Sequence, residues 1–278
     1  MGLPVVTKEN YFSPAIQQAY MSVSQFKDFE RCEAAALARI QGEFPQEETT
    51  ALLVGSYVDA VFSEEIAEFR ENHPGLFKRD GTLKAEFRRA EELVERMRGD
   101  PLYTLLLSGK KQVIRTGHIA GVPFKIKIDS LLDGATCQTI VQRFPGTANA
   151  LGFCDGAIVD QKVIKDTEDV WEPELHSQVP FAIHWGYDLQ GAVYQAVEGH
   201  MLPFILAVGT KQTPPALEAV YLPDQSLAAK LAEVEDRAPR YQAIKEGRIP
   251  PTRCGTCAYC RATRKLDRII DYREVGTW

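Results

Sequence analysis

Helical periodicity dominates the first hundred residues. Ser22 followed by Gln25 has the pattern of a capping box, and apolar residues then recur every three or four positions until Gly42. A later, highly charged helix is stopped by Gly99 and Pro101. The pattern predicts helices over residues 22–42, 50–67 and 83–98.

The hydrophobic period changes to two in the middle of the chain. Two alternating runs between Gln112 and Leu132 flank the turn-like segment His118–Gly121, which predicts a β-hairpin. The stretch 134–156 that follows is interpreted as a loop-like insertion. Beyond it we expect strands over residues 157–164, 204–208 and 217–222 and helices over 181–198 and 226–245, the last disturbed at Pro239.

This order of elements is typical of a mixed α/β protein. Helices, strands, a helix, strands and a helix follow one another with no linker that would divide them. We therefore predict a single domain over residues 1–278. Its expected parts are a mainly helical N-terminal part over 1–105, a core over 110–225 and a C-terminal helix with a cysteine cluster over 226–278.

Composition adds little to this picture, except in one segment. The 278 residues are 45% apolar and 25% charged, as in a globular protein that buries a core, and the net charge is −6. No stretch approaches the roughly 20 apolar residues that span a bilayer. The N-terminus has no basic start followed by an apolar run, so we expect a cytoplasmic protein without membrane contact. Between Lys245 and Arg268, seven basic residues oppose two acidic ones, either as a nucleic-acid-binding patch or as a solvated tail.

Acidic and basic side chains share a face on two predicted strands. Lys125, Lys127 and Asp129 point the same way along the second strand of the hairpin, and Asp160 and Lys162 do so on the next strand. If these strands are neighbours, two carboxylates and an ammonium meet. Carboxylates bind Mg²⁺ or Mn²⁺, which polarises a phosphate and activates water, and a lysine can orient that water or offset developing charge. The set would suit hydrolysis of a phosphodiester.

Each of these motifs also has an ordinary structural explanation. An Asp-x-Lys tripeptide in a strand is usually an ion pair. Gln190 and Tyr194 share one helical face at positions i and i+4, which also fits a helix that packs its tyrosine in a core.

The ordered set of motifs resembles a known family. An acidic residue on one strand, Asp-x-Lys on the next and Gln-x-x-x-Tyr on the following helix are similar to the RecB-type branch of the PD-(D/E)XK nucleases. From about Tyr11 to Val275 the chain resembles phage and prophage exonucleases related to the RecE (exonuclease VIII) group. The segments that carry the likeness are Leu53–Ala60, Ile128–Asp129, Val159–Lys162, Trp185–Tyr194 and Arg253–Cys260.

The resemblance implies a restriction-endonuclease-like core, a central mixed sheet flanked by helices, and assigns roles within it. Asp129 and Asp160 would be metal ligands and Lys162 the catalytic lysine. Gln161 would offer its backbone carbonyl to the same Mg²⁺ or Mn²⁺ ion.

The resemblance also assigns roles to residues on the predicted helices. Gln190 and Tyr194 would contact the DNA end or position the lysine. Where many relatives have Gly-x-x-x-His, this chain has Gly55 followed by Asp59, which could also bind metal. The 31 positions from Asp129 to Asp160 exceed what a tight hairpin needs, so the insertion is either a lid or DNA-guiding loop or a surface excursion.

Three cysteines near the C-terminus have the spacing of metal ligands. Cys254, Cys257 and Cys260 form Cys-x-x-Cys-x-x-Cys, and a chain without a secretion signal is not expected to form a disulfide framework. The nuclease resemblance makes Cys32 the fourth ligand, because related proteins with iron–sulfur clusters place one cysteine ahead of the core. The expected group is a [4Fe–4S] cluster, with Zn²⁺ as the alternative metal and reduced structural thiols as the alternative to any metal.

The leading interpretation is a metal-dependent DNA exonuclease that acts on linear duplex ends in phage-type recombination or DNA processing. A recombination partner protein and a homo-oligomer are compatible with it. The alternatives are a non-catalytic, metal-stabilised DNA-binding or assembly module on the same fold, and a zinc-stabilised interaction domain in which Asp-x-Lys is only an ion pair.

Overall fold

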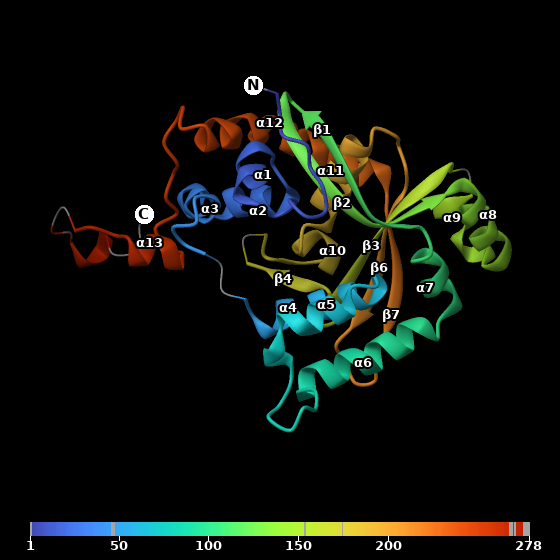
Figure 1. The fold of residues 1–278 in the computed structure, drawn as a ribbon. Coiled ribbons are helices and arrows are strands. Elements are labelled where there is room, and N and C mark those ends of the chain that lie inside the picture. The colour runs from blue at the N-terminus through green and yellow to red at the C-terminus, as the bar shows by residue number, and fades with distance from the viewer. Residues whose placement is uncertain are drawn as a thin grey trace. The chain divides into compact units, whose positions relative to one another are not determined.

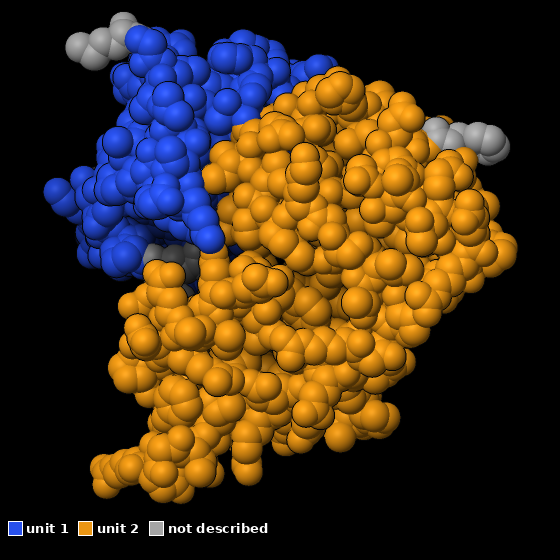
Figure 2. Space-filling view, turned by 45° about the vertical axis from the view of Figure 1, so that its right-hand side comes forward, with its two compact units in different colours: residues 1–47, 116–126, 232–278 blue, residues 48–115, 127–231 orange. Residues whose placement is uncertain are grey.

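The computed structural model describes residues 2–45, 48–152, 154–173, 175–266, 269 and 271–274 (Figure 1). The chain forms two compact units, which Figure 2 shows in separate colours. Unit 1 comprises residues 1–47, 116–126 and 232–278, and unit 2 comprises residues 48–115 and 127–231. The prediction of a single domain stays a prediction.

Unit 1 is built mainly from short helices. They are α1 (Pro14–Ala19), α2 (Val23–Arg31), α3 (Glu33–Ile40), α13 (Ala258–Ala262), the 3₁₀ turn η3 (Tyr272–Glu274) and most of α12 (Asp224–Lys245). Pro239 lies inside α12, which continues through it to Lys245.

The helix predicted over residues 22–42 is two helices. Its start is confirmed, because Ser22 Oγ accepts a hydrogen bond from the N–H of Gln25 at 3.3 Å. The side chain of Gln25 donates instead to the carbonyl of Gln17, so only one half of the capping box forms. Cys32 has extended backbone angles, φ −167° and ψ 109°, which end α2 and begin α3. The prediction missed this break because only Cys32 separates the two helices, and apolar residues recur on both sides of it.

A mixed five-stranded sheet forms the centre of the fold (Figure 1). Its order is β1-β2-β3-β6-β7, with β2–β3 and β6–β7 antiparallel and β3–β6 parallel. The strands are β1 (Lys110–Ile119), β2 (Val122–Asp133), β3 (Gly156–Ile164), β6 (Phe204–Thr210) and β7 (Leu217–Leu222). The predicted mixed central sheet is therefore confirmed.

The register of β2 against β3 places two acidic residues side by side. Ser130 pairs with Val159, so Asp129 precedes Ser130 on one strand where Asp160 follows Val159 on the other. Because the strands are antiparallel, these two positions face each other across the pair. Residues 31 positions apart in sequence thus become neighbours.

Helices cover both faces of the sheet in unit 2. Val159, Ile205 and Ala207 belong to one core cluster with α4 (Thr50–Phe62), α6 (Ala85–Arg98) and α8 (Gly134–Arg143). On the other face, Phe204 packs against α11 (Tyr187–Glu198) at Gly191. The remaining elements of unit 2 are α5 (Ile66–Asn72), η1 (Pro74–Leu76), α7 (Pro101–Leu106), η2 (Pro145–Thr147), α9 (Ala148–Leu151), β4 (Val170–Glu172), β5 (Ser177–Val179) and α10 (Phe181–His184).

Three predictions about unit 2 were wrong in detail. The insertion 134–156 is largely helical, because Asp133 caps α8 through the N–H of Thr136 and α8 buries Cys137 and Ile140. The helix predicted over 181–198 is interrupted at Gly186, whose φ of 63° only glycine adopts readily. The helix predicted over 50–67 ends at Phe62, and the small ribbon of β4 and β5 was not predicted.

No helix among the described residues combines the length and the apolar character needed to cross a membrane.

Candidate active site

The centre of the candidate site is the pair of carboxylates on β2 and β3. Asp129 Oδ2 accepts a hydrogen bond of 2.9 Å from the backbone N–H of Gln161, so β3 fixes the carboxylate that β2 carries. Asp160 is buried, with 2% of its surface exposed. The two acidic side chains predicted to meet are therefore brought together.

Lys162 lies in the same place. Its ammonium forms an ion pair with Asp160 Oδ2 and lies 5.5 Å from the centre of the Tyr187 ring. Burial opposes the charge, but the carboxylates of Asp160 and Asp129 outweigh it and raise the pKa of Lys162. The lysine is therefore a fixed cation beside the two carboxylates.

Helix α11 supplies Gln190 and Tyr194, and the two have different contacts. Gln190 Nε2 donates a 2.6 Å hydrogen bond to Asp160 Oδ1. The Tyr194 hydroxyl donates to the carbonyl of Lys127 at 3.0 Å, two residues before Asp129 on β2. Gln190 therefore contacts an acidic residue rather than the lysine, and Tyr194 ties α11 to the backbone of β2.

Helix α4 brings Asp59 to the same site. The charges of Lys127, Asp160 and Lys162 all act on its carboxylate, and Gln112 Nε2 donates to Asp59 Oδ1 at 3.2 Å. The structure thus places Asp59 with the residues of β2 and β3. Gln161 directs its side chain elsewhere, to the hydroxyl of Tyr103 at 3.3 Å.

Burial and neighbouring carboxylates disfavour the ionised forms of Asp129 and Asp59. Desolvation, followed by the charges of Asp160 and Asp59, raises the pKa of Asp129 to about 8. Desolvation also raises the pKa of Asp59, although Lys127 lowers it. A divalent cation that prefers oxygen ligands would stabilise these carboxylates in their ionised form, so the residues present fit Mg²⁺ or Mn²⁺.

Besides Gln112, two residues of the site were not singled out from the sequence. Lys111, on β1, is near enough to Asp129 and Asp59 for their charges to act on its ammonium. Tyr187, beneath Lys162, lies three positions before Gln190 on α11 and so on the same helical face. That spacing was a usable signal for Tyr187, whereas nothing in the spacing of β1 pointed to Lys111.

Unit 1 contains a second cluster, made by the four predicted cysteines. The sulfur atoms of Cys32, Cys254, Cys257 and Cys260 all lie within 4.8 Å of one another. The measured separations are 3.6 Å from Cys32 to Cys260 and 3.9 Å from Cys254 to Cys260. Residues more than 220 positions apart are therefore assembled as one four-thiol group.

Backbone amides prepare this group for a cation. The N–H of Cys257 donates to the sulfur of Cys254 at 3.3 Å and lowers the pKa of Cys254 to about 6. The N–H of Cys260 donates to the sulfur of Cys257 at 3.4 Å. Burial raises the pKa of Cys260 to about 12, so a bound cation would be needed to ionise this thiol near neutral pH.

Among the described residues of the basic segment near the C-terminus, Lys245 is buried, whereas Arg248, Arg253, Arg261, Arg264 and Lys265 are exposed. Lys245 is buried and donates to the carbonyls of Gln17 and Tyr20. Arg253 donates to the carbonyl of Cys260. Arg268 lies outside the described residues. Lys245 is therefore withdrawn from any surface that could contact nucleic acid, while the exposed basic side chains remain on it.

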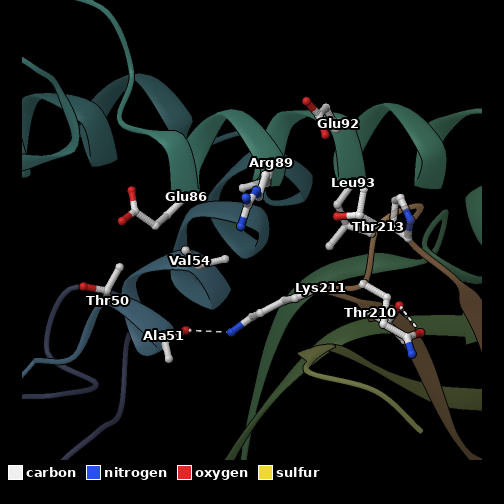
Figure 3. Close-up of a pocket in the computed structure, with 13 residues that line it drawn as sticks. Thr50, Ala51, Val54, Glu86, Arg89, Glu92, Leu93, Thr210, Lys211 and Thr213 are labelled. Atoms are coloured by element: carbon white, nitrogen blue, oxygen red, sulfur yellow. Dashed lines mark hydrogen bonds between the residues drawn. The ribbon is translucent and has the colours of Figure 1, made fainter.

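A separate cavity of about 200 Å³ in unit 2 contains none of the predicted site residues. It lies between α4, α6 and the segment after β6, and Figure 3 shows Lys211 extended toward the carbonyl of Ala51, to which it donates at 3.2 Å. Glu86, Arg89 and Glu92 line the same cavity with mixed charge.

Comparison with known proteins identifies a family and a solved relative. A family model described as "PDDEXK-like domain of unknown function (DUF3799)" matches residues 22–138 and 151–263. A crystal structure of a "putative exonuclease" from Eubacterium rectale is 36% identical, with 98% of each chain covered and a TM-score of 0.85. Among curated proteins, none matches the chain.

Proposed function

The chain belongs to the PDDEXK-like family DUF3799, and from this premise we propose that it is a metal-dependent deoxyribonuclease that degrades DNA from its ends. The expected PD-(D/E)XK fold is confirmed by the family model and by the solved relative. The exonuclease activity, the DNA substrate and a role in phage-type recombination are our proposal.

One observation carries this proposal: Asp129 and Asp160 oppose each other on adjacent strands, with the ammonium of Lys162 paired to Asp160. A binding module would gain nothing from a buried pair of carboxylates in which the charge of Asp160 helps to raise the pKa of Asp129. A phosphodiesterase needs them, because they hold the cation that offsets the charge of the phosphate.

The proposed roles follow from the contacts of each side chain. Asp129, Asp160 and Asp59, with the backbone carbonyl of Gln161, would hold Mg²⁺ or Mn²⁺, which supplies polarisation of the phosphate and an acidified water when bound. Lys162 remains protonated and donates to the attacked phosphate or its water.

Helix α11 contributes by orientation. Gln190 fixes one oxygen of Asp160, which leaves the other to face Lys162. Tyr194 holds the backbone of β2 two residues before Asp129. Both residues would act through the carboxylates, and direct contact with the DNA end is not required of either.

The preference for DNA ends rests on the name of the solved relative. End-labelled linear duplex and a covalently closed circle of the same sequence are incubated with Mg²⁺, Mn²⁺ or EDTA. We expect loss of the linear substrate with either metal, no loss in EDTA and survival of the circle. Equal cleavage of the circle would make the protein an endonuclease, and no cleavage of either would remove the nuclease proposal.

We also propose that the four cysteines bind a single tetrahedral metal ion, most simply Zn²⁺. Four ligands about 2.3 Å from a tetrahedral zinc lie about 3.8 Å from one another. The separations of 3.6 Å and 3.9 Å match that value. A [4Fe–4S] cluster would lie between the four sulfur atoms and hold them farther apart than a single ion does. It is the alternative that elemental analysis would reveal.

A further inference from the structure

Gln112 has an unusual backbone for a strand residue. Four described residues other than glycine have positive φ: Glu64, Gln112, Ala120 and His176. Three of them are at turns, after α4, in the β1–β2 hairpin and between β4 and β5. Gln112 alone among them lies inside a strand, β1, with φ 50°. Strain of this kind persists where the surrounding structure needs it, often at functional sites.

The reversed φ has a direct consequence for side-chain direction. In a regular strand, consecutive side chains point to opposite faces. Here Gln112 faces the carboxylates and donates to Asp59 Oδ1 at 3.2 Å, while the ammonium of the preceding Lys111 donates to the carbonyl of Leu107. An irregularity that re-aims a side chain is what a bulge beside an active site provides.

The carbonyl oxygen of the Gln112 side-chain amide lacks a hydrogen-bond donor among the described residues. This atom, Oε1, is also buried. A buried carbonyl oxygen without a donor is disfavoured and uncommon in native proteins. A donor that enters with a ligand would complete it.

We propose that Gln112 is a positioning residue that holds Asp59 through its amide N–H and keeps Oε1 for a water that accompanies the divalent cation. This rests on the proposed function, because it assumes that Asp59 faces a metal ion. It assigns the strained segment of β1 to metal binding rather than to folding.

The test is Mn²⁺ binding without DNA, measured by isothermal titration calorimetry. Gln112→Ala and Gln112→Gly both remove the amide, and the glycine suits the positive φ, so it guards against loss of the fold. The matched control is Gln178→Ala, an exposed glutamine on β5. We expect both Gln112 variants to bind Mn²⁺ about tenfold or more weakly, and the control to bind like the parent.

The unfolding temperature without metal gives the second readout. Because Gln112→Gly removes both the backbone strain and the unpaired oxygen, we expect this variant to unfold no lower than the parent. Unchanged Mn²⁺ affinity in a parent that binds Mn²⁺ and cleaves DNA would overturn the role of Gln112 alone. A parent that neither binds Mn²⁺ nor cleaves would overturn the proposed function, and this inference with it.

Discussion

Asp160 is contacted by Lys162 of its own strand and by Gln190 of α11. Lys162 pairs with one of its oxygens and Gln190 donates to the other, while Asp129 lies opposite it on β2. A carboxylate with this environment is held in one orientation, and its negative charge is stabilised by Lys162 but opposed by Asp129. Single substitutions around it should therefore separate catalysis from stability.

Lys162→Ala should lower the cleavage rate by about 10²–10³ without releasing the metal, because it removes a cation aimed at developing charge and leaves the carboxylates in place. Single-turnover cleavage and Mn²⁺ titration measure the two effects. Lys165→Ala is the matched control, since Lys165 is 93% exposed and pairs with Asp166. A Lys162 variant as fast as the parent would remove the lysine from the mechanism.

Gln190→Ala should impair cleavage more than folding. It leaves Asp160 Oδ1 without its 2.6 Å donor, so we expect the rate to fall about 10- to 100-fold. The lost hydrogen bond should cost about 1 kcal/mol of unfolding free energy. Denaturant unfolding and cleavage are measured on the same preparation. Normal cleavage with a large loss of stability would make Gln190 an ordinary core residue.

At the scale of elements, the sequence identified strands better than helix ends. The hairpin, β3, β6 and β7 were predicted because alternating apolar residues and a turn signal are local properties. The breaks at Cys32 and Gly186 were missed, since apolar spacing is unaffected by one residue with non-helical backbone angles. The helices of the 134–156 insertion were missed because they are short and become stable only by packing against β3.

Helix α11 is expected to tolerate no side chain at Gly191. A Cβ there would lie 2.8 Å from Phe204 Cδ1 and 2.9 Å from Leu227 Cδ2, so Gly191→Ala should destabilise the fold by about 1–3 kcal/mol. Gly55, inside α4, has no atom within 4 Å of its added Cβ, and Gly55→Ala should stabilise by up to about 1 kcal/mol. Chemical denaturation of both variants checks the opposite signs. Equal effects would mean that α11 does not pack on β6 as described.

At the scale of the whole molecule, the two candidate sites belong to different compact units. The carboxylates lie in unit 2 and the four cysteines in unit 1. Strand alternation predicted the meeting of Asp129, Asp160 and Lys162, and the Cys-x-x-Cys spacing predicted the three C-terminal cysteine ligands. The other members of the two sites were expected only from the family resemblance, because they lie on other elements of the chain. The sequence could not place Gln112, because the direction of that side chain depends on one reversed φ in β1.

Removal of the metal proposed at the four cysteines should lower the unfolding temperature, because these cysteines join distant segments of unit 1. We expect about one zinc per chain by elemental analysis, and Cys32→Ser should lose it and unfold at a lower temperature. Cys154→Ser is the control, because Cys154 lies outside the four-cysteine cluster. Brown protein containing iron after anaerobic purification would replace the single ion by a [4Fe–4S] cluster with the same ligands. If elemental analysis detects neither zinc nor iron, the four cysteines are reduced thiols and the metal proposal is wrong.

The most direct test of the central claim is single-turnover cleavage of linear duplex DNA by Asp160→Asn in Mg²⁺. The substitution keeps the size of the side chain but removes a negative charge that the metal requires. Asp166→Asn, six residues along the same segment and paired with Lys165, is the matched control. The account predicts that Asp160→Asn folds like the parent and loses cleavage by at least about 10³-fold, whereas Asp166→Asn cleaves normally. Parent-like cleavage by folded Asp160→Asn would contradict the assignment of Asp160, Asp129 and Lys162 as the active site.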